Sequence, residues 1–142
     1  MRAVVQRVTK SSVTVDGQIT GATDEGLVVL IGVEEGDTDK DVRYIADKVS
    51  GLRIFEDENE KMNLSVKDVG GSILAISQFT LLGDVRKGKR PSFITAEDPE
   101  IANRLYQQVC ESIRNEGIKV ETGIFQAHML VKINNNGPVT IL

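Results

Sequence analysis

An unbroken apolar segment from Gly26 to Val33 sets the strongest limit on how this chain of 142 residues can fold. The segment is short for a helix and rich in β-branched residues, so it predicts a buried strand. The segment from Ser72 to Leu82 is also largely apolar and predicts a second strand, central in its sheet and buried on both faces. Other elements of the chain must therefore cover the sheet.

Turn residues separate several further segments that favour strands. Asp16-Gly17 is a strong hairpin signal between the strand-forming segments Ser12–Val15 and Gln18–Gly21. The other strands are predicted at Ala3–Thr9, Arg53–Phe55, Ile118–Glu121, Phe125–Ile133 and Val139–Leu142, with a turn at Asn134–Gly137 before the last of them.

Two segments repeat apolar residues at the spacing of a helix face. The first is capped by Asp37 or Thr38 and ends near Gly51, with apolar positions at Val42, Ile45, Ala46 and Val49. The second begins near Pro99 and ends at Gly117, with apolar positions at Ala102, Leu105, Tyr106, Val109 and Ile113. Because strands and helices do not alternate regularly, we predict an α+β fold, a single domain over residues 1–142 with mostly antiparallel sheets forming an open barrel and two main helices.

Composition excludes several classes of protein. Apolar residues make up 40% of the chain and charged residues 27%, which is typical of a globular rather than a disordered or fibrous chain. With one cysteine, Cys110, and one histidine, His128, the chain can form neither an internal disulfide nor the usual Cys/His zinc site, and no metal or cofactor is expected. Neither a membrane span nor a signal peptide is recognisable, so we expect a cytoplasmic protein without membrane contact.

Polar residues interrupt the apolar segment between Ser72 and Leu82. If this segment is a strand, Gln78 and Thr80 share one face and Ser77 and Phe79 share the other. A buried amide or hydroxyl without a partner costs roughly 1–3 kcal/mol, so these residues need a reason to be there. Either they form a functional site, or neighbouring backbone groups satisfy them within the core.

A basic loop follows this segment. Residues 83–89 fit the pattern G-x-x-x-x-G-K, but Arg90 and Pro91 follow where a phosphate-binding loop needs Ser or Thr and a helix. We therefore reject a nucleoside-triphosphate site. The loop concentrates basic side chains in a chain whose net charge is −4, and it either contacts a phosphate backbone or is a solvated surface loop; its basic residues are Arg86, Lys87, Lys89 and Arg90.

Three other features have plain interpretations from local sequence. Asn135 to Pro138 is a turn signal, and nothing in the neighbouring residues makes its X-Pro bond cis. His128 lies opposite the apolar residues of its segment and is either exposed or part of a pocket wall. Cys110 follows the apolar stripe of the second helix and is predicted to be a small buried side chain.

The segments Ser77-Gln78-Phe79-Thr80-Leu81 and Asn135-Asn136-Gly137-Pro138-Val139-Thr140 resemble the two signature motifs of D-aminoacyl-tRNA deacylases of the D-tyrosyl-tRNA deacylase type. The resemblance spans nearly the whole chain and includes the supporting stretches Gln6–Val8, Gly26–Val33, Lys61–Leu64 and Arg90–Phe93. The family often has an acidic residue at position 136 and aspartate at position 128, where this chain has asparagine and histidine.

This resemblance implies an enzyme that hydrolyses the ester between a D-amino acid and the terminal adenosine of tRNA. It also implies removal of mischarged glycine and rejection of L-aminoacyl-tRNA. Catalysis would lie at Ser77, Gln78, Phe79 and Thr80, with backbone amides around Phe79 and Thr80 stabilising the oxyanion. Thr80 would either act as a nucleophile or orient the substrate while the 2′-hydroxyl of the RNA helps to activate water.

The resemblance further implies a homodimer in which the two subunits share each site. In the family the Gly-Pro bond is cis, and its loop enters the active site of the other subunit. Gly137 and Pro138 would then direct backbone carbonyls at the α-carbon of the substrate, where an L side chain would meet them and a D side chain would point away. Arg86, Lys87, Lys89 and Arg90 are the candidate tRNA contacts.

Two further hypotheses differ in the kind of function. The chain could be a non-catalytic RNA-binding module of the same fold, which would bind tRNA in a salt-sensitive manner without turnover. It could instead be a hydrolase of small esters or peptides that uses Thr80 as its nucleophile, which would act on a free D-amino-acid ester without RNA.

Overall fold

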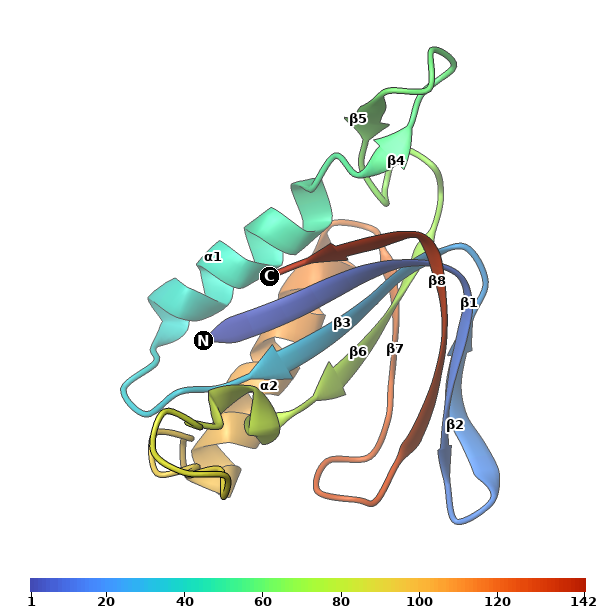
Figure 1. The fold of residues 1–142 in the computed structure, drawn as a ribbon. Coiled ribbons are helices and arrows are strands. Elements are labelled where there is room, and N and C mark those ends of the chain that lie inside the picture. The colour runs from blue at the N-terminus through green and yellow to red at the C-terminus, as the bar shows by residue number, and fades with distance from the viewer.

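A six-stranded sheet organises the chain, and two helices pack against one of its faces (Figure 1). The structure, a computed structural model, describes residues 1–142. In chain order its elements are β1 (Arg2–Val15), β2 (Gln18–Thr23), β3 (Gly26–Gly32), α1 (Asp39–Gly51), β4 (Phe55–Glu56), β5 (Met62–Leu64), β6 (Ser72–Ser77), the 3-10 helix η1 (Phe79–Leu82), α2 (Pro99–Asn115), β7 (Lys119–Thr122) and β8 (Leu130–Ile141). The predicted α+β class with two main helices is confirmed.

The strand order in the sheet is β2-β1-β3-β6-β7, and β8 pairs with β1. β1 runs antiparallel to β2, β3 and β8, whereas the pairs β3–β6 and β6–β7 are parallel. The connections between the parallel strands contain α1 and α2, because a parallel pair needs a long crossover. The expected antiparallel pairing therefore holds around β1, and the helical crossovers account for the parallel pairs around β6.

The sheet curls until β2 lies against β6 and β7. A Cβ atom placed on Gly21 of β2 would lie 2.7 Å from the carbonyl oxygen of Thr122 and 3.2 Å from Leu74 Cδ1. Only glycine fits such an approach between a strand and the far side of its own sheet. The sheet is thus nearly closed, as the prediction of an open barrel requires.

Apolar side chains fill both sides of β3, which was predicted as a buried strand. Leu27, Val29 and Ile31 belong to the large core between the sheet and the helices, while Val28 belongs to a smaller core inside the curled sheet. The alternation follows the two-residue period of a strand. The smaller core consists of Val8, Val13, Val28, Leu74 and Ile76.

The helix ends follow their sequence signals. Thr38 caps α1, and the side chain of Asp41 accepts a hydrogen bond from the Thr38 N–H at 2.8 Å, which completes a capping box. Pro99 begins α2 after the cap Asp98, as its fixed φ angle favours. Gly117 follows α2 with a φ of 84°, in the left-handed region that glycine tolerates. Neither the length nor the hydropathy of any helix suits a membrane span.

Several strand predictions are wrong in their extent, including Arg53–Phe55, where the strand β4 begins only at Phe55. The segment Ser72–Leu82 is not one strand, because β6 ends at Ser77 and η1 follows. Ala3–Thr9 and Ser12–Val15 are parts of the single strand β1. The predicted strand Phe125–Ile133 begins only at Leu130.

The turn predicted at Asn134–Gly137 is a bulge within β8. Val8 of β1 pairs with Asn135, and Gln6 pairs with Thr140, so residues 136–139 lie opposite Arg7 alone. The surplus residues leave the ladder and return to it, which lets one strand continue through a sequence that is typical of a turn.

Candidate functional site

A cleft of about 460 Å³ opens where β6 ends and η1 begins. Four stretches of chain form it: the end of β3, the β6–η1 junction, the start of α2 with the residues before it, and the turn before β8. Its wall is mostly apolar with a few polar groups, as in many small-molecule sites. The lining residues are Val33, Ser77, Gln78, Phe79, Thr80, Ala96, Glu97, Pro99, Ala102, Phe125, Gln126, Ala127 and Met129.

The polar residues that interrupt the predicted strand lie in the wall of this cleft. Ser77 and Gln78 are half-buried, and Thr80 is exposed. The side-chain amide of Gln78 donates a hydrogen bond from Nε2 to Oγ1 of Thr80 at 3.1 Å. The structure thus brings Ser77, Gln78, Phe79 and Thr80 together at one opening, and neighbouring backbone does not absorb the Gln78 amide or the Thr80 hydroxyl within the core.

The backbone amides of η1 are available to a ligand. The first N–H groups of a helix have no acceptor inside it. The hydrogen bonds formed outside regular elements include none from the N–H groups of Phe79 or Thr80. These two donors have no acceptor within η1, and their position next to the Thr80 hydroxyl is suited to binding an oxygen that carries negative charge.

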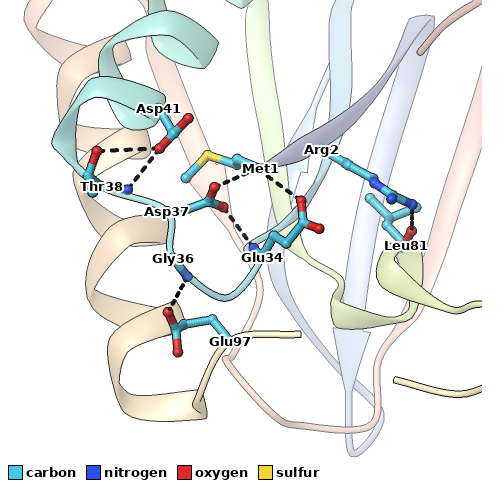
Figure 2. A network of polar contacts seen from close by, with 9 residues as sticks. All are labelled: Met1, Arg2, Glu34, Gly36, Asp37, Thr38, Asp41, Leu81 and Glu97. Carbon is cyan, nitrogen blue, oxygen red and sulfur yellow. Dashed lines mark hydrogen bonds and ion pairs between the residues drawn. The ribbon is translucent and has the colours of Figure 1, made fainter. Parts of the chain in front are cut away.

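The cleft wall on the α2 side is tied to the loop between β3 and α1. The N–H of Glu35 donates to the carbonyl of Thr95 at 2.8 Å, and the N–H of Glu97 donates to the carbonyl of Val33 at 3.0 Å. The Gly36 N–H also donates to Oε2 of Glu97 at 3.3 Å (Figure 2). Glu97 is the acidic residue of the cleft lining, and no sequence motif had indicated it.

The same loop is held by charged groups (Figure 2). The amino group of Met1 lies 2.8 Å from Oδ1 of Asp37, whose Oδ2 accepts a hydrogen bond from the N–H of Glu34 at 2.7 Å. At the start of α1, the backbone N–H of Thr38 lowers the pKa of Asp41. These contacts fix the loop that supports Ala96 and Glu97 of the cleft lining.

Gly137 and Pro138 do not line this cleft. They lie exposed on the bulge of β8, and the peptide bond between them is cis. Asn135 holds the base of the bulge, because its Nδ2 atom donates to the carbonyls of Arg7 and Val139 at 3.0 Å each. The two predicted motifs are therefore at separate places in one protomer.

Arg7 supports the bulge from inside the protein. Only 7% of this residue is exposed. Its Nη1 atom donates to the carbonyl of Ile54 at 2.8 Å, and its Nε atom donates to the carbonyl of Asn136 at 3.3 Å. Glu56 lies 3.9 Å from Nη2 and balances the charge. The sequence predicted no role for Arg7; its signals were its place in the stretch Gln6–Val8 that resembles the family and a basic residue within a β-rich segment.

The basic loop lies beside η1, outside the cleft lining. All four predicted basic residues are exposed. Arg86 is engaged with Asp84, since its Nε and Nη2 atoms lie 3.0 Å and 2.8 Å from the two carboxylate oxygens. This interaction lowers the pKa of Asp84 to about 2. Lys87, Lys89 and Arg90 form no ion pair within the chain.

His128 and Cys110 take no part in the cleft. His128 is exposed in the turn before β8 and is absent from the lining. Cys110 is fully buried in the core, as predicted, and burial raises the pKa of its thiol. No three side chains of the His, Cys, Asp and Glu types gather as a metal site would require.

Comparisons with known proteins match the whole length of the chain. A family model described as D-Tyr-tRNA(Tyr) deacylase matches residues 4–142. Proteins named D-aminoacyl-tRNA deacylase from Koribacter versatilis and Desulfitobacterium hafniense are 61% and 58% identical, over 100% of this chain and 95% of each relative.

Solved structures also share the fold. One named c-Myc DNA Unwinding Element Binding Protein superposes with a TM-score of 0.93 at 43% identity, covering 99% of this chain and 96% of the other. A probable eukaryotic D-amino acid tRNA deacylase superposes with a TM-score of 0.81 over 98% and 96% of the two chains. At 17% identity the second likeness concerns the fold alone.

Proposed function

Because this chain belongs to the D-Tyr-tRNA(Tyr) deacylase family and is a hydrolase acting on ester bonds, we propose that its cleft holds the ester between a D-amino acid and the terminal adenosine of tRNA. The observation that carries this proposal is the position of Ser77–Thr80. Ser77, Gln78 and Thr80 place three polar side chains side by side in a mostly apolar cleft, next to two backbone amides that have no acceptor within η1. The product would be a free D-amino acid and tRNA, released in the cytoplasm where aminoacyl-tRNA is used.

The N–H groups of Phe79 and Thr80 stabilise the oxyanion that forms when water attacks the ester carbonyl. One such donor contributes about 2.7–4 kcal/mol to catalysis. The carbon–oxygen bond to the ribose then breaks, the ribose oxygen takes up a proton, and the amino acid leaves with the oxygen of water. An aminoacyl ester is already activated, so these donors can supply much of the catalysis.

Thr80 orients the substrate and does not attack it. A hydroxyl nucleophile needs a base that accepts its proton. The group that contacts Oγ1 of Thr80 is the Gln78 side-chain amide, which donates a hydrogen bond and cannot accept that proton. The 2′-hydroxyl of the terminal ribose helps to activate the attacking water, and Gln78 contacts the substrate or braces Thr80. Ser77 supports this junction.

Selection against L-amino acids comes from Gly137 and Pro138 of a second copy of the chain. In one protomer these residues are exposed and lie outside the cleft, so they can act on a substrate only across a homodimer. Their carbonyl oxygens would face the α-carbon and clash with an L side chain. Glycine has no side chain to exclude, which explains why mischarged glycyl-tRNA would also be a substrate.

Hydrolysis of D-tyrosyl-tRNA compared with L-tyrosyl-tRNA tests this function. We expect release of D-tyrosine and little release of L-tyrosine by the intact chain. Equal rates on both, or no release from the D substrate, would contradict the proposal. Salt-sensitive binding of tRNA without turnover would indicate an RNA-binding module instead. Efficient hydrolysis of a free D-tyrosine ester would indicate a small-ester hydrolase.

A further inference from the structure

We propose that residues 83–94, called the arm below, bind the unpaired nucleotides next to the terminal adenosine and not the base-paired acceptor stem. This inference rests on the proposed function, because it concerns the RNA part of the same substrate.

The base of the arm is fixed beside the cleft. Asp84 and Ser92 exchange backbone hydrogen bonds of 2.8 Å and 3.0 Å, which close the loop between them. The N–H of Gly83 donates to the carbonyl of Thr80 at 3.0 Å. The rings of Phe93 and Phe79 meet edge to face with centroids 5.2 Å apart. An RNA strand that leaves the cleft beside Thr80 therefore passes the arm first.

Three of the four basic side chains are free to contact phosphates. The two-pronged contact with Asp84 occupies Arg86, so this residue braces the arm and adds little net charge. Lys87, Lys89 and Arg90 are exposed and unpaired within the chain. They place three uncompensated cations on one short loop of a protein whose net charge is −4.

Exposed apolar side chains accompany these cations. Ile94 is 84% exposed, Val85 61% and Phe79 58%, and Phe93 is partly exposed beside Phe79. Cations together with exposed aromatic rings are typical of surfaces that bind single-stranded nucleic acid, because unpaired bases can stack on the rings. A paired stem hides the faces of its bases and exposes phosphates, sugars and groove edges. It therefore offers apolar side chains little surface on which to pack.

The reach of the arm agrees with this choice. The tip of the closed loop is Gly88, whose φ of 76° suits a tight reversal. Four residues on each side can extend at most about 13 Å from the base. Stacked nucleotides of one strand advance by about 3.4 Å each, so the arm spans roughly four of them. That is the length of the unpaired 3′ end of a tRNA.

Three substrates separate the possible contacts: D-tyrosyl-tRNA, D-tyrosyl-CCA trinucleotide and D-tyrosyl-adenosine. We expect the triple variant Lys87→Gln, Lys89→Gln, Arg90→Gln to raise KM roughly tenfold or more on both tRNA and the trinucleotide. The increase in KM for D-tyrosyl-adenosine should be at least tenfold smaller than the increase for either of the other two substrates. The variant Lys119→Gln is the control for loss of a surface charge remote from the cleft. Its exposed amine, 3.9 Å from Oε1 of Glu121, lies at the start of β7 beside Ser72, the end of β6 away from η1.

The salt dependence of binding tests the division of tasks. Each lost phosphate contact on a single strand lowers the slope of log Kd against log salt by about 0.7. With tRNA that ends in CCA and carries no amino acid as the ligand, we expect the triple variant to lower this slope by about 2. We expect Arg86→Gln to weaken binding while leaving the slope nearly as it is, because its charge is already balanced by Asp84.

Two results would overturn the inference. One is a rise in KM for D-tyrosyl-tRNA that is absent for D-tyrosyl-CCA trinucleotide, which would place the contacts on the paired stem. The other is an unchanged KM with a shifted monomer–dimer equilibrium in sedimentation, which would make the arm a protein contact. Failure of the intact chain to hydrolyse D-tyrosyl-tRNA would instead contradict the proposed function itself.

Discussion

At the scale of single residues, the site depends on one change of backbone geometry. Strand β6 ends at Ser77, and the tighter η1 turns the next side chains and amides toward an opening in the wall of the protein. Polar residues that would be costly inside a strand are thereby placed where a substrate can pair with them. This explains why the apolar pattern breaks at Ser77–Thr80.

Replacing Thr80 by alanine separates an orienting role from a nucleophilic one. We expect kcat/KM on D-tyrosyl-tRNA to fall by about 10- to 100-fold, the effect of losing one or two hydrogen bonds to the substrate. Removal of a covalent nucleophile would instead lower kcat by about a millionfold. Steady-state kinetics distinguish the two, and Thr80→Ser should retain most of the activity because it keeps the hydroxyl.

The Asp84 carboxylate has a pKa near 2 because Arg86 donates hydrogen bonds to its charged form. A lowered pKa stabilises the folded arm above the unfolded pKa of about 3.9, and this stabilisation is lost as the pH falls toward 2. Carbon NMR titration should therefore give a midpoint near 2 for Asp84. In Arg86→Gln the midpoint should return toward 3.8, while Asp57, whose pKa is lowered mainly by the backbone N–H groups of Lys61 and Asn59, should not move.

At the scale of elements, α2 is anchored to the sheet by one buried hydrogen bond. The hydroxyl of Tyr106 donates to the carbonyl of Ala75 in β6 at 2.7 Å. Burial raises the pKa of Tyr106, which favours the protonated hydroxyl that donates this bond. The contact sets α2, which lines the cleft, against the strand that leads into η1.

We expect Tyr106→Phe to lower the free energy of unfolding by about 0.5–1.5 kcal/mol, because one buried hydrogen bond to the carbonyl of Ala75 is lost. Urea denaturation measures this change. Tyr44→Phe is the control, since Tyr44 is 62% exposed on α1 and its loss should have almost no effect. Equal stability of both variants would show that this hydrogen bond adds nothing to the stability of the fold.

The bulge of β8 carries Gly137 and Pro138, which we propose select against L-amino acids. Arg7→Met removes the donors to Ile54 and Asn136, and we expect it to cost about 1–3 kcal/mol of stability for the buried carbonyl of Ile54. Because the bulge carries Gly137 and Pro138, its loosening should also raise the ratio of L-tyrosyl-tRNA to D-tyrosyl-tRNA hydrolysis. Arg43→Met, at an exposed position of α1, should leave that ratio as it is.

At the scale of the whole molecule, one protomer holds the two motifs apart. None of the residues that line the cleft belongs to the β8 bulge. If the bulge acts on a substrate in the cleft of a second copy, each complete site needs two chains. The arrangement can be tested by mixing subunits.

Mixing two variant chains tests this arrangement. A chain with a defective cleft, Gln78→Ala with Thr80→Ala, should restore the selection against L-tyrosyl-tRNA when it forms mixed dimers with the Arg7→Met chain. In mixed dimers the intact cleft of the Arg7→Met chain receives the intact bulge of its partner. We therefore expect hydrolysis of L-tyrosyl-tRNA to fall when the cleft-defective chain is added in excess, with exchange verified by native mass spectrometry. Unchanged L hydrolysis after complete exchange would mean that each bulge acts within its own chain.

Local patterns in the chain were enough to predict the two helices with their caps, the buried strand β3, the hairpin at Asp16-Gly17, and the polar residues around Thr80. Periodicity, capping and turn chemistry depend on neighbours a few residues apart, which the sequence shows directly. The parallel pairing around β6, the break between Ser77 and Phe79, the bulge opposite Arg7 and the support of the cleft by Glu97 came only with the folded chain. Each depends on contacts between residues that are far apart in the chain. These contacts contribute free energy only once the sheet has closed.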